Sequence, residues 1–249
     1  MQQRYILAGH SHAMALGAKF GPADAVSSLD RLPGFSADVL ALSGPFPPQE
    51  PHWDLLVQSA ANSTVFLLWQ GNQHLARFLF ATGPPFDFFI ATQPDRAVHP
   101  DAVIVPESAV RDVMRAGFDG LSPLLDRLNA VAGCNPVVVG TPPPKGDDDK
   151  LRRLLVEPHF MREAERQGLS VETAPLISAT IRLKLWLVMQ EVLYEIANRH
   201  GRPFVPVPEE AFDEQGFLKE EFWLPDVTHA NLRYGDLMWK HLTGPGNAS

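Results

Sequence analysis

The stretch that decides the fold is YILAGHSH, residues 5–12. The apolar run Tyr5-Ile6-Leu7-Ala8 predicts a buried strand, and Gly9-His10-Ser11-His12 ends that strand in a polar turn. The residues that follow, about 13–20, predict a helix. A continuously apolar strand that leads into a turn and a helix is typical of a parallel sheet with both faces covered.

The same pattern recurs along the chain. Further strands are predicted at 38–42, 64–69, 136–139 and 204–207, and helices at about 52–61, 108–132 with a break near 117–120, 157–167, 176–200 and 227–242. This alternation predicts an α/β fold with a mostly parallel five-stranded sheet, in one domain that spans residues 1–249.

Residues 75–105 interrupt the alternation. Five phenylalanines lie there around Gly83-Pro84-Pro85, and they predict an insertion with little regular structure that caps the sheet edge. This stretch either lines a pocket for an acyl or aglycone group or packs against the sheet. At the other end, residues 244–249 predict a mobile tail.

Composition excludes several classes of protein. The 249 residues are 45% hydrophobic and 20% charged, which fits a globular protein with a full core. The net charge is −8 and no dense basic cluster is present, which argues against nucleic acid and anionic membranes as partners. No run approaches the roughly 18 apolar residues that span a bilayer. The single cysteine, Cys134, forms no internal disulfide, and with the charge it favours the cytoplasm.

Polar residues follow several of the predicted strands. They lie at Gly9–His12, Ser43-Gly44, 71–74 and Gly140-Thr141, and Asp226–His229 comes after the last strand. Because sites in parallel sheets form at the carboxyl ends of the strands, we expect these loops to converge on one edge.

Ser11 is the candidate nucleophile of that edge. It follows a strand and opens a helix, where its hydroxyl is exposed and its N–H can point at an anion. A serine nucleophile needs a neighbouring base, because the free hydroxyl is almost wholly protonated. The alternative is that Ser11 only caps the helix.

Asp226 and His229 are the candidate base and its partner. A spacing of three residues puts both side chains on one side of a turn, so the carboxylate can bind one imidazole nitrogen and leave the other as a base. The alternative is that Asp226 caps the last helix while His229 packs or is solvated.

Gly44 and Asn72 are candidate donors to a developing oxyanion. A glycine N–H at a strand end approaches closely, and an asparagine amide supplies a second donor. For Asn72 the alternative is a turn residue beside Gly71.

Taken in order, Ser11, Gly44, Gly71-Asn72 and Asp226-x-x-His229 resemble the SGNH (GDSL-like) hydrolase family, over nearly the whole chain. The resemblance implies a flavodoxin-like three-layer α/β/α sandwich that cleaves or transfers acyl groups on oxygen. It implies Ser11 as nucleophile, His229 as base and Asp226 as its orienting carboxylate. The Ser11 and Gly44 N–H groups and the Asn72 side chain would form the oxyanion hole.

Two blocks depart from the family pattern. The first reads Gly9-His10-Ser11 where the family usually has Gly-Asp-Ser. The third is usually Gly-x-Asn-Asp, and here either Gly71-Asn72-Gln73 is one residue shorter or Gln70 takes the place of the glycine. They indicate a divergent branch. His10 and His74 are candidate substrate contacts. A zinc site built from His10, His12 and His74 lacks a supporting motif, so we expect no metal.

These residues predict a serine esterase that acts on an O-acyl ester, with an acetylated carbohydrate as the substrate class that the resemblance implies. The alternatives are an O-acyltransferase acting on a glycan and an inactive binding protein on the same fold. No glycine-rich phosphate motif follows the first strand, so we expect no nucleotide cofactor. The oligomeric state stays open.

Overall fold

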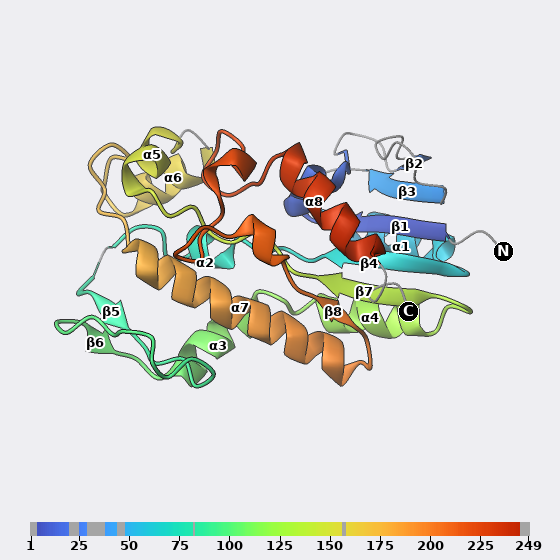
Figure 1. Ribbon diagram of the computed structural model, residues 1–249, viewed down its shortest axis with the longest axis horizontal. Coiled ribbons are helices and arrows are strands. Elements are labelled where there is room, and N and C mark those ends of the chain that lie inside the picture. Colours follow the sequence, from blue (N-terminus) through green and yellow to red (C-terminus); the bar gives the residue numbers. More distant parts are fainter. Residues whose placement is uncertain are drawn as a thin grey trace.

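The computed structural model describes residues 4–19, 25–28, 38–43, 48–81, 83–155 and 158–244. Its centre is a six-stranded sheet of order β2-β3-β1-β4-β7-β8 (Figure 1). The strands of this sheet are β1 (Arg4–Gly9), β2 (Ala25–Ser28), β3 (Asp38–Ser43), β4 (Ser63–Leu68), β7 (Asn135–Val139) and β8 (Phe204–Val205). A separate two-stranded sheet pairs β5 (Phe86–Asp87) with β6 (Val103–Ile104).

The five predicted strands are all present and run parallel to one another. Their order along the sheet is second, first, third, fourth and fifth, which is the flavodoxin-like order. The predicted number of strands was wrong, because β2 adds a sixth, antiparallel strand beside β3. Its four residues, Ala25-Val26-Ser27-Ser28, include one β-branched side chain and carry little strand signal.

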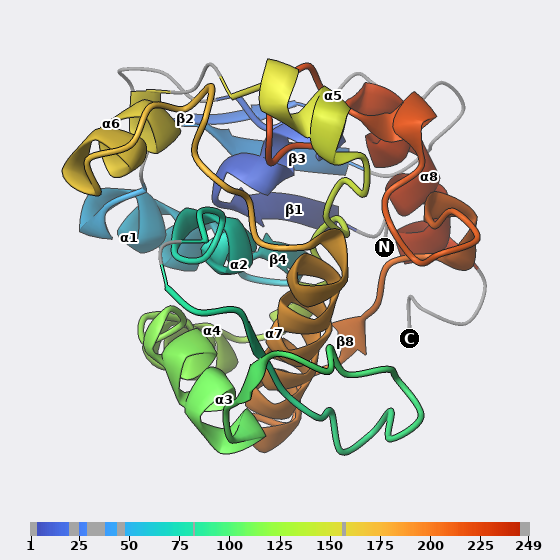
Figure 2. The same cartoon turned by 90° about the vertical axis from the view of Figure 1, so that its left-hand side faces the viewer.

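Most of the α-helices lie close to predicted positions, but those at Gln73–Ala76 and Asp148–Arg153 are additional to the predicted helices. The α-helices are α1 (Glu50–Ser59), α2 (Gln73–Ala76), α3 (Glu107–Ala116), α4 (Leu121–Asn129), α5 (Asp148–Arg153), α6 (Pro158–Arg166), α7 (Ala179–Arg199) and α8 (Leu232–Thr243). The 3-10 helices are η1 (Ser11–Leu16), η2 (Glu209–Ala211) and η3 (Glu220–Phe222). In Figure 2, α1 and α4 lie on one side of the sheet and α8 on the other, which gives the three-layer α/β/α arrangement.

Two of the predicted helices differ from the structure. The helix expected at about 13–20 is the shorter 3-10 helix η1. The helix expected from residue 227 begins at Leu232, because the Asn231 side chain accepts the N–H groups of Arg233 and Tyr234 and caps it. Asp226 therefore does not cap α8.

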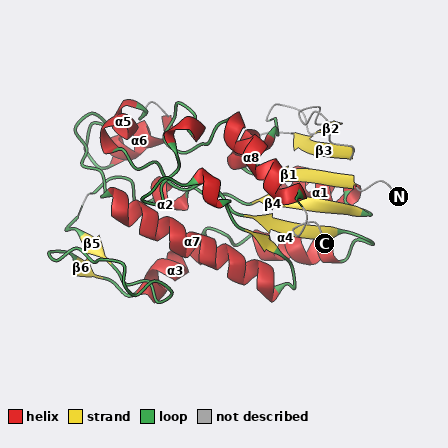
Figure 3. Cartoon of the chain, viewed as in Figure 1, coloured by secondary structure: helices red, strands yellow, loops and turns green. Residues whose placement is uncertain are grey.

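The main hydrophobic core lies on both faces of the central strands. Every residue of β4 is buried, as are all residues of β1 and β7 except the first of each, which explains why these strands read as continuous apolar runs. Most of α7 is buried as well, and this helix extends well beyond the sheet (Figure 3).

A second hydrophobic cluster lies beyond the carboxyl ends of the strands. Its buried members are Leu75, Leu79, Phe80, Leu151, Leu155, Phe160, Ala164, Ala174 and Val227. These residues come from α2, α5, α6 and the connecting segments, which Figure 1 shows to the left of the sheet. This cluster packs α2, α5 and α6 together beyond the edge of the sheet at which the candidate site residues lie.

Residues 75–105 contain little regular structure, as predicted. A buried ion pair attaches them to α7: Lys184 Nζ lies 2.7 Å from Asp87 Oδ1 and donates to the Phe88 carbonyl oxygen at 3.2 Å. The predicted tail from 244 continues outside the described residues. Within the described part of the chain, no helix is both long and apolar enough to cross a membrane.

Candidate active site

Asp226 and His229 form a closed turn in the segment between η3 and α8. One carboxylate oxygen, Asp226 Oδ1, accepts the backbone N–H groups of Thr228 at 2.9 Å and of His229 at 2.7 Å. The other, Oδ2, lies 2.8 Å from His229 Nδ1. The two backbone bonds fix the carboxylate, so the carboxylate in turn fixes the imidazole ring.

The electrostatics of this pair favour an ionised carboxylate. Burial alone would raise the pKa of Asp226, but the hydrogen bonds and charge of His229 and the charge of Lys145 outweigh burial and bring the pKa to about 2. A carboxylate at Nδ1 selects the imidazole tautomer whose Nε2 is an acceptor. Nε2 is buried and has no hydrogen-bond partner among the described residues. The ring therefore presents Nε2 as an acceptor that no described residue bonds.

Ser11 lies at the start of η1, directly after β1. The His10 N–H donates to the Leu68 carbonyl oxygen at 2.9 Å, so the turn leaves the sheet at the carboxyl end of β4. The ring of the next residue, His12, lies 5.3 Å from the His229 ring between centroids. The structure thus brings the Ser11 loop to the His229 loop. It does not contain a hydrogen bond between Ser11 and His229 Nε2, and such bonds often form only when substrate is bound.

A close approach between η1 and α8 holds these two loops together. A Cβ atom on Gly235 would lie 1.7 Å from the Ala15 carbonyl oxygen, so only glycine fits there. The indole N–H of Trp239 donates to the Leu16 carbonyl oxygen at 2.8 Å. Both residues of α8 therefore contact η1, which begins at Ser11, and α8 begins three residues after His229.

Asn72 lies in the loop after β4, the neighbour of β1. Gly71 has a φ of 117°, and a Cβ atom on it would lie 2.4 Å from Thr141 Cγ2, so this loop packs directly on the loop after β7. The Asn72 carbonyl oxygen accepts the N–H groups of Leu75 and Ala76 and begins α2. The Asn72 side chain is half-buried. Gly44, the other predicted oxyanion donor, lies outside the described residues.

His10 connects the Ser11 loop to the Asn72 loop. Its Nδ1 accepts the Gln70 N–H at 3.2 Å. Its ring lies 4.7 Å from the ring of Trp69 and 5.6 Å from that of Trp53. Burial and the charge of His52 lower the pKa of His10 to about 4, so the ring is neutral at pH 7 and Nδ1 can accept. His10 thus accepts a hydrogen bond from the neighbouring loop, which the aspartate of a Gly-Asp-Ser block could also do.

His12 and His74 are two further buried histidines near this edge. Each is about 2% exposed, and neither has a hydrogen-bond partner among the described residues. Burial, followed by the charge of His229, lowers the pKa of His12 well below its usual value. Burial and the charge of Arg182 lower the pKa of His74 to about 3. The described residues contain no group of three or more metal-ligating side chains with the geometry to hold an ion.

Lys145 is a site residue that the sequence did not reveal. It is about 2% exposed, and its Nζ lies 3.5 Å from Asp226 Oδ1. The same Nζ donates to the carbonyl oxygens of Leu224, at 2.7 Å, and of Asp226. The only sequence signal was a lysine in a proline-rich loop after β7, and a lysine in such a loop is normally solvated.

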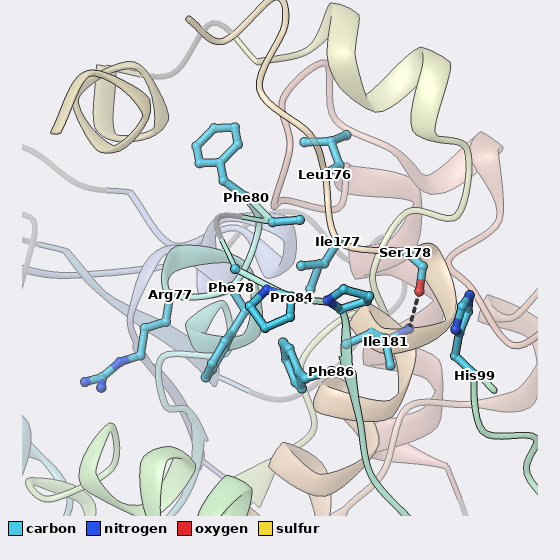
Figure 4. Close-up of a pocket in the computed structure, with 13 residues that line it drawn as sticks. Arg77, Phe78, Phe80, Pro84, Phe86, His99, Leu176, Ile177, Ser178 and Ile181 are labelled. Atoms are coloured by element: carbon cyan, nitrogen blue, oxygen red, sulfur yellow. Dashed lines mark hydrogen bonds between the residues drawn. The ribbon is translucent and has the colours of Figure 1, made fainter. Parts of the chain in front are cut away.

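A cavity of about 330 Å³ lies at the end of α2 away from Asn72. Figure 4 shows the rings of Phe78, Pro84 and Phe86 gathered at its centre, beside Ile181 of α7. Part of the phenylalanine-rich stretch therefore lines a cavity, whereas Phe88 packs in the main core and Phe89 is exposed. The residues that line the cavity do not include Ser11, Asn72, Asp226 or His229.

Solved structures with a similar fold provide the comparison with known proteins. The periplasmic domain of a lipopolysaccharide acetyltransferase from Salmonella Paratyphi A matches with a TM-score of 0.52 and 10% identity, over 97% of this chain and 82% of that one. A protein from Streptococcus pneumonia described as a platelet activating factor matches with a TM-score of 0.50 and 14% identity, over 97% and 83%. An acetyl-xylooligosaccharide esterase from Geobacillus scores 0.49 with 10% identity, over 96% and 92%.

At these identities the likeness is one of fold. The chain matches no protein-family model and no curated protein sequence. The two structures that score 0.50 and 0.52 cover nearly the whole chain, so the fold is shared from β1 to α8.

Proposed function

We propose that this protein is a serine-dependent acyl hydrolase or acyl transferase, a divergent member of the SGNH group, and that Ser11 is its nucleophile. The observation that carries the proposal is the Asp226–His229 pair. Its carboxylate is fixed by two backbone N–H groups, and its imidazole keeps Nε2 without a partner in the described part of the chain. A base prepared in this way, beside a serine at a strand–helix turn, fits acyl transfer on oxygen.

In the proposed reaction, His229 Nε2 takes the hydroxyl proton of Ser11 as Oγ attacks the acyl carbonyl. The Ser11 and Gly44 N–H groups and the Asn72 amide stabilise the oxyanion that develops. The imidazolium then gives its proton to the leaving alkoxide, and an acyl-serine ester remains. Water or a second hydroxyl, deprotonated by Nε2, attacks this ester and regenerates Ser11. No step uses a metal or an organic cofactor.

The substrate we propose is a small O-acyl ester, with acetylated carbohydrates as the first class to test. Support comes from the resemblance in sequence and from a neighbour of similar fold whose name is that of an acetyltransferase acting on lipopolysaccharide. His10 and His74 remain proposed substrate contacts. The single cysteine, Cys134, is buried, and with the net charge it makes the cytoplasm the proposed compartment.

The test is hydrolysis of p-nitrophenyl acetate by the wild type and by Ser11→Ala, with folding checked by circular dichroism. We expect the variant to lose activity, while Ser108→Ala, on the exposed surface of α3, keeps it. Full activity in Ser11→Ala would overturn the proposal. Product analysis with an added sugar acceptor then distinguishes transfer from hydrolysis.

One observation favours a second candidate, an inactive carbohydrate-binding protein. His229 Nε2 is not bonded to Ser11, and the Gly-Asp-Ser block is altered at His10. A Ser11 that ignores fluorophosphonate probes, in a folded protein without esterase activity that binds glycans, would favour this candidate.

A further inference from the structure

The strongest feature that the proposed chemistry leaves unused is the amino group of Lys145. This residue comes from the loop after β7, and its side chain passes under the segment that carries Asp226. Nζ donates to the carbonyl oxygens of Leu224 and Asp226 and lies 3.5 Å from Asp226 Oδ1. It also lies 5.5 Å from the centre of the Trp223 ring. One buried cation thus contacts the backbone, the carboxylate and an aromatic ring of the same short segment.

We propose that Lys145 is a positioning residue for the Asp226–His229 pair: its amino group holds the carboxylate in place, and its positive charge acts on the pair from beside Oδ1. This inference rests on the proposed function. It adds a charged group to the pair beside Oδ1, whereas the imidazole is bonded to Oδ2.

The geometry separates the two effects of Lys145. Its bonds to the carbonyl oxygens of Leu224 and Asp226 fix the backbone that leads to the carboxylate. Its ion pair places a positive charge 3.5 Å from Oδ1, the atom that also accepts the Thr228 and His229 N–H groups. Loss of the first effect displaces the base, and loss of the second changes the charge that the base experiences.

Among the described residues, three charged or titratable groups lie around the His229 ring. Asp226 Oδ2 lies 2.8 Å from its Nδ1, the His12 ring of η1 lies 5.3 Å away between centroids, and Lys145 Nζ lies 3.5 Å from Asp226 Oδ1. His12 is neutral at pH 7, because burial and the charge of His229 lower its pKa well below the usual value. Lys145 is therefore the group whose positive charge opposes protonation of the imidazole, against the attraction of Asp226.

This arrangement gives the direction of the effect. The positive charge of Lys145 disfavours a second positive charge on the imidazole, and without the lysine the attraction of Asp226 for such a charge is unopposed. We expect the midpoint of the acid limb of kcat/KM to move up by about one pH unit.

The experiment compares Lys145→Met with Lys184→Met. Lys184 is an equally buried lysine with a buried carboxylate partner, Asp87, and it lies on α7 away from Asp226. Both variants remove a buried amino group from an ion pair, so Lys184→Met controls for the loss of a buried lysine as such. Lys145→Gln is made as well, because it keeps a neutral hydrogen-bond donor and serves if the methionine variant does not fold.

Two readouts are taken from each folded variant: the pH profile of kcat and KM with p-nitrophenyl acetate, and the titration of the His229 imidazole by NMR. We expect Lys145→Met to lower kcat by about 10²-fold with little change in KM, because the base is displaced. We expect the acid limb and the imidazole titration to move to higher pH together, in Lys145→Gln too, and to stay in place in Lys184→Met.

An unmoved titration in folded Lys145→Met or Lys145→Gln would overturn the inference, as would an equal shift in Lys184→Met. The NMR titration needs no activity, so it separates this inference from the proposed function. If Ser11→Ala keeps esterase activity while Lys145→Met moves the titration, the chemistry is wrong and the role of Lys145 stands.

Discussion

The Nδ1 atom of His229 lies 2.8 Å from Asp226 Oδ2, while Asp226 Oδ1 accepts the N–H of His229 itself. The same carboxylate therefore holds both the backbone and the ring of the histidine. This double attachment sets the direction in which Nε2 points, and Lys145 Nζ, 3.5 Å from Oδ1, adds a contact to the carboxylate from the loop after β7.

Asp226→Asn is expected to lower kcat by about 10⁴-fold, the size of the loss when the equivalent change is made in Ser-His-Asp proteases. The asparagine oxygen can still accept the two backbone N–H groups, but its amide donates to Nδ1 and selects the tautomer with a proton on Nε2. The measurement is kcat for p-nitrophenyl acetate beside the exposed Asp119→Asn. A variant that stays within tenfold of the wild type would show that Asp226 shapes the turn and nothing more.

Asn72→Ala is expected to lower kcat by about 10²–10³-fold and to leave KM nearly unchanged, because an oxyanion donor acts mainly in the transition state. The Asn72 carbonyl oxygen, which begins α2, is kept in the variant. Asn198→Ala, on the exposed surface of α7, is the control. A rise in KM at constant kcat would instead make Asn72 a ground-state contact.

Gly235→Ala is expected to destabilise the protein by about 1–3 kcal/mol, although alanine has a higher helix propensity than glycine. The new Cβ would lie 1.7 Å from the Ala15 carbonyl oxygen, and neither backbone can yield without moving η1 from α8. Urea unfolding measures the loss. Gly83→Ala is the control, since a Cβ there has no neighbour within 4 Å. We also expect a fall in kcat, because η1 begins at Ser11.

Stability is expected to fall as the pH drops below about 6.5, the value for a histidine in an unfolded chain. The pKa of His74 is lowered to about 3 and that of His12 lies well below its usual value, so the unfolded state binds protons that the folded state does not. Each of these histidines lowers the free energy of unfolding by about 1.4 kcal/mol for each pH unit of acidification between the two pKa values. This contribution is complete above pH 6.5 and is lost as the pH falls toward the folded pKa.

His74→Gln should reduce the pH dependence of the free energy of unfolding by the contribution of one histidine. Urea unfolding at pH 7, 6 and 5 measures this dependence. The exposed His159→Gln is the matched control. An unchanged slope in His74→Gln would mean that its ring gains a partner in solution.

Much of the architecture was predictable because strands buried on both faces carry a continuous apolar pattern. β1, β4 and β7 followed this rule. The polar residues at the ends of the strands predicted that the loops of Ser11 and His229 would meet, and the His12 and His229 rings lie 5.3 Å apart between centroids. β2 was missed because an edge strand with small polar residues has little pattern to detect. The start of α8 was placed too early because an Asp and an Asn five residues apart both resemble helix caps, and only the backbone decides between them.

The sequence by itself determined the fold class, the strand–turn–helix setting of Ser11 and the three-residue spacing that joins Asp226 to His229, because all three depend on patterns local in the chain. Only the tertiary structure decided that His10 joins two loops, that Gly235 lets η1 approach α8, and that Lys145 lies against Asp226. Each of these contacts connects residues that are far apart in sequence. Lys145 and Asp226 are charged residues that usually face water, and only tertiary packing buries the Lys145 amino group against Asp226.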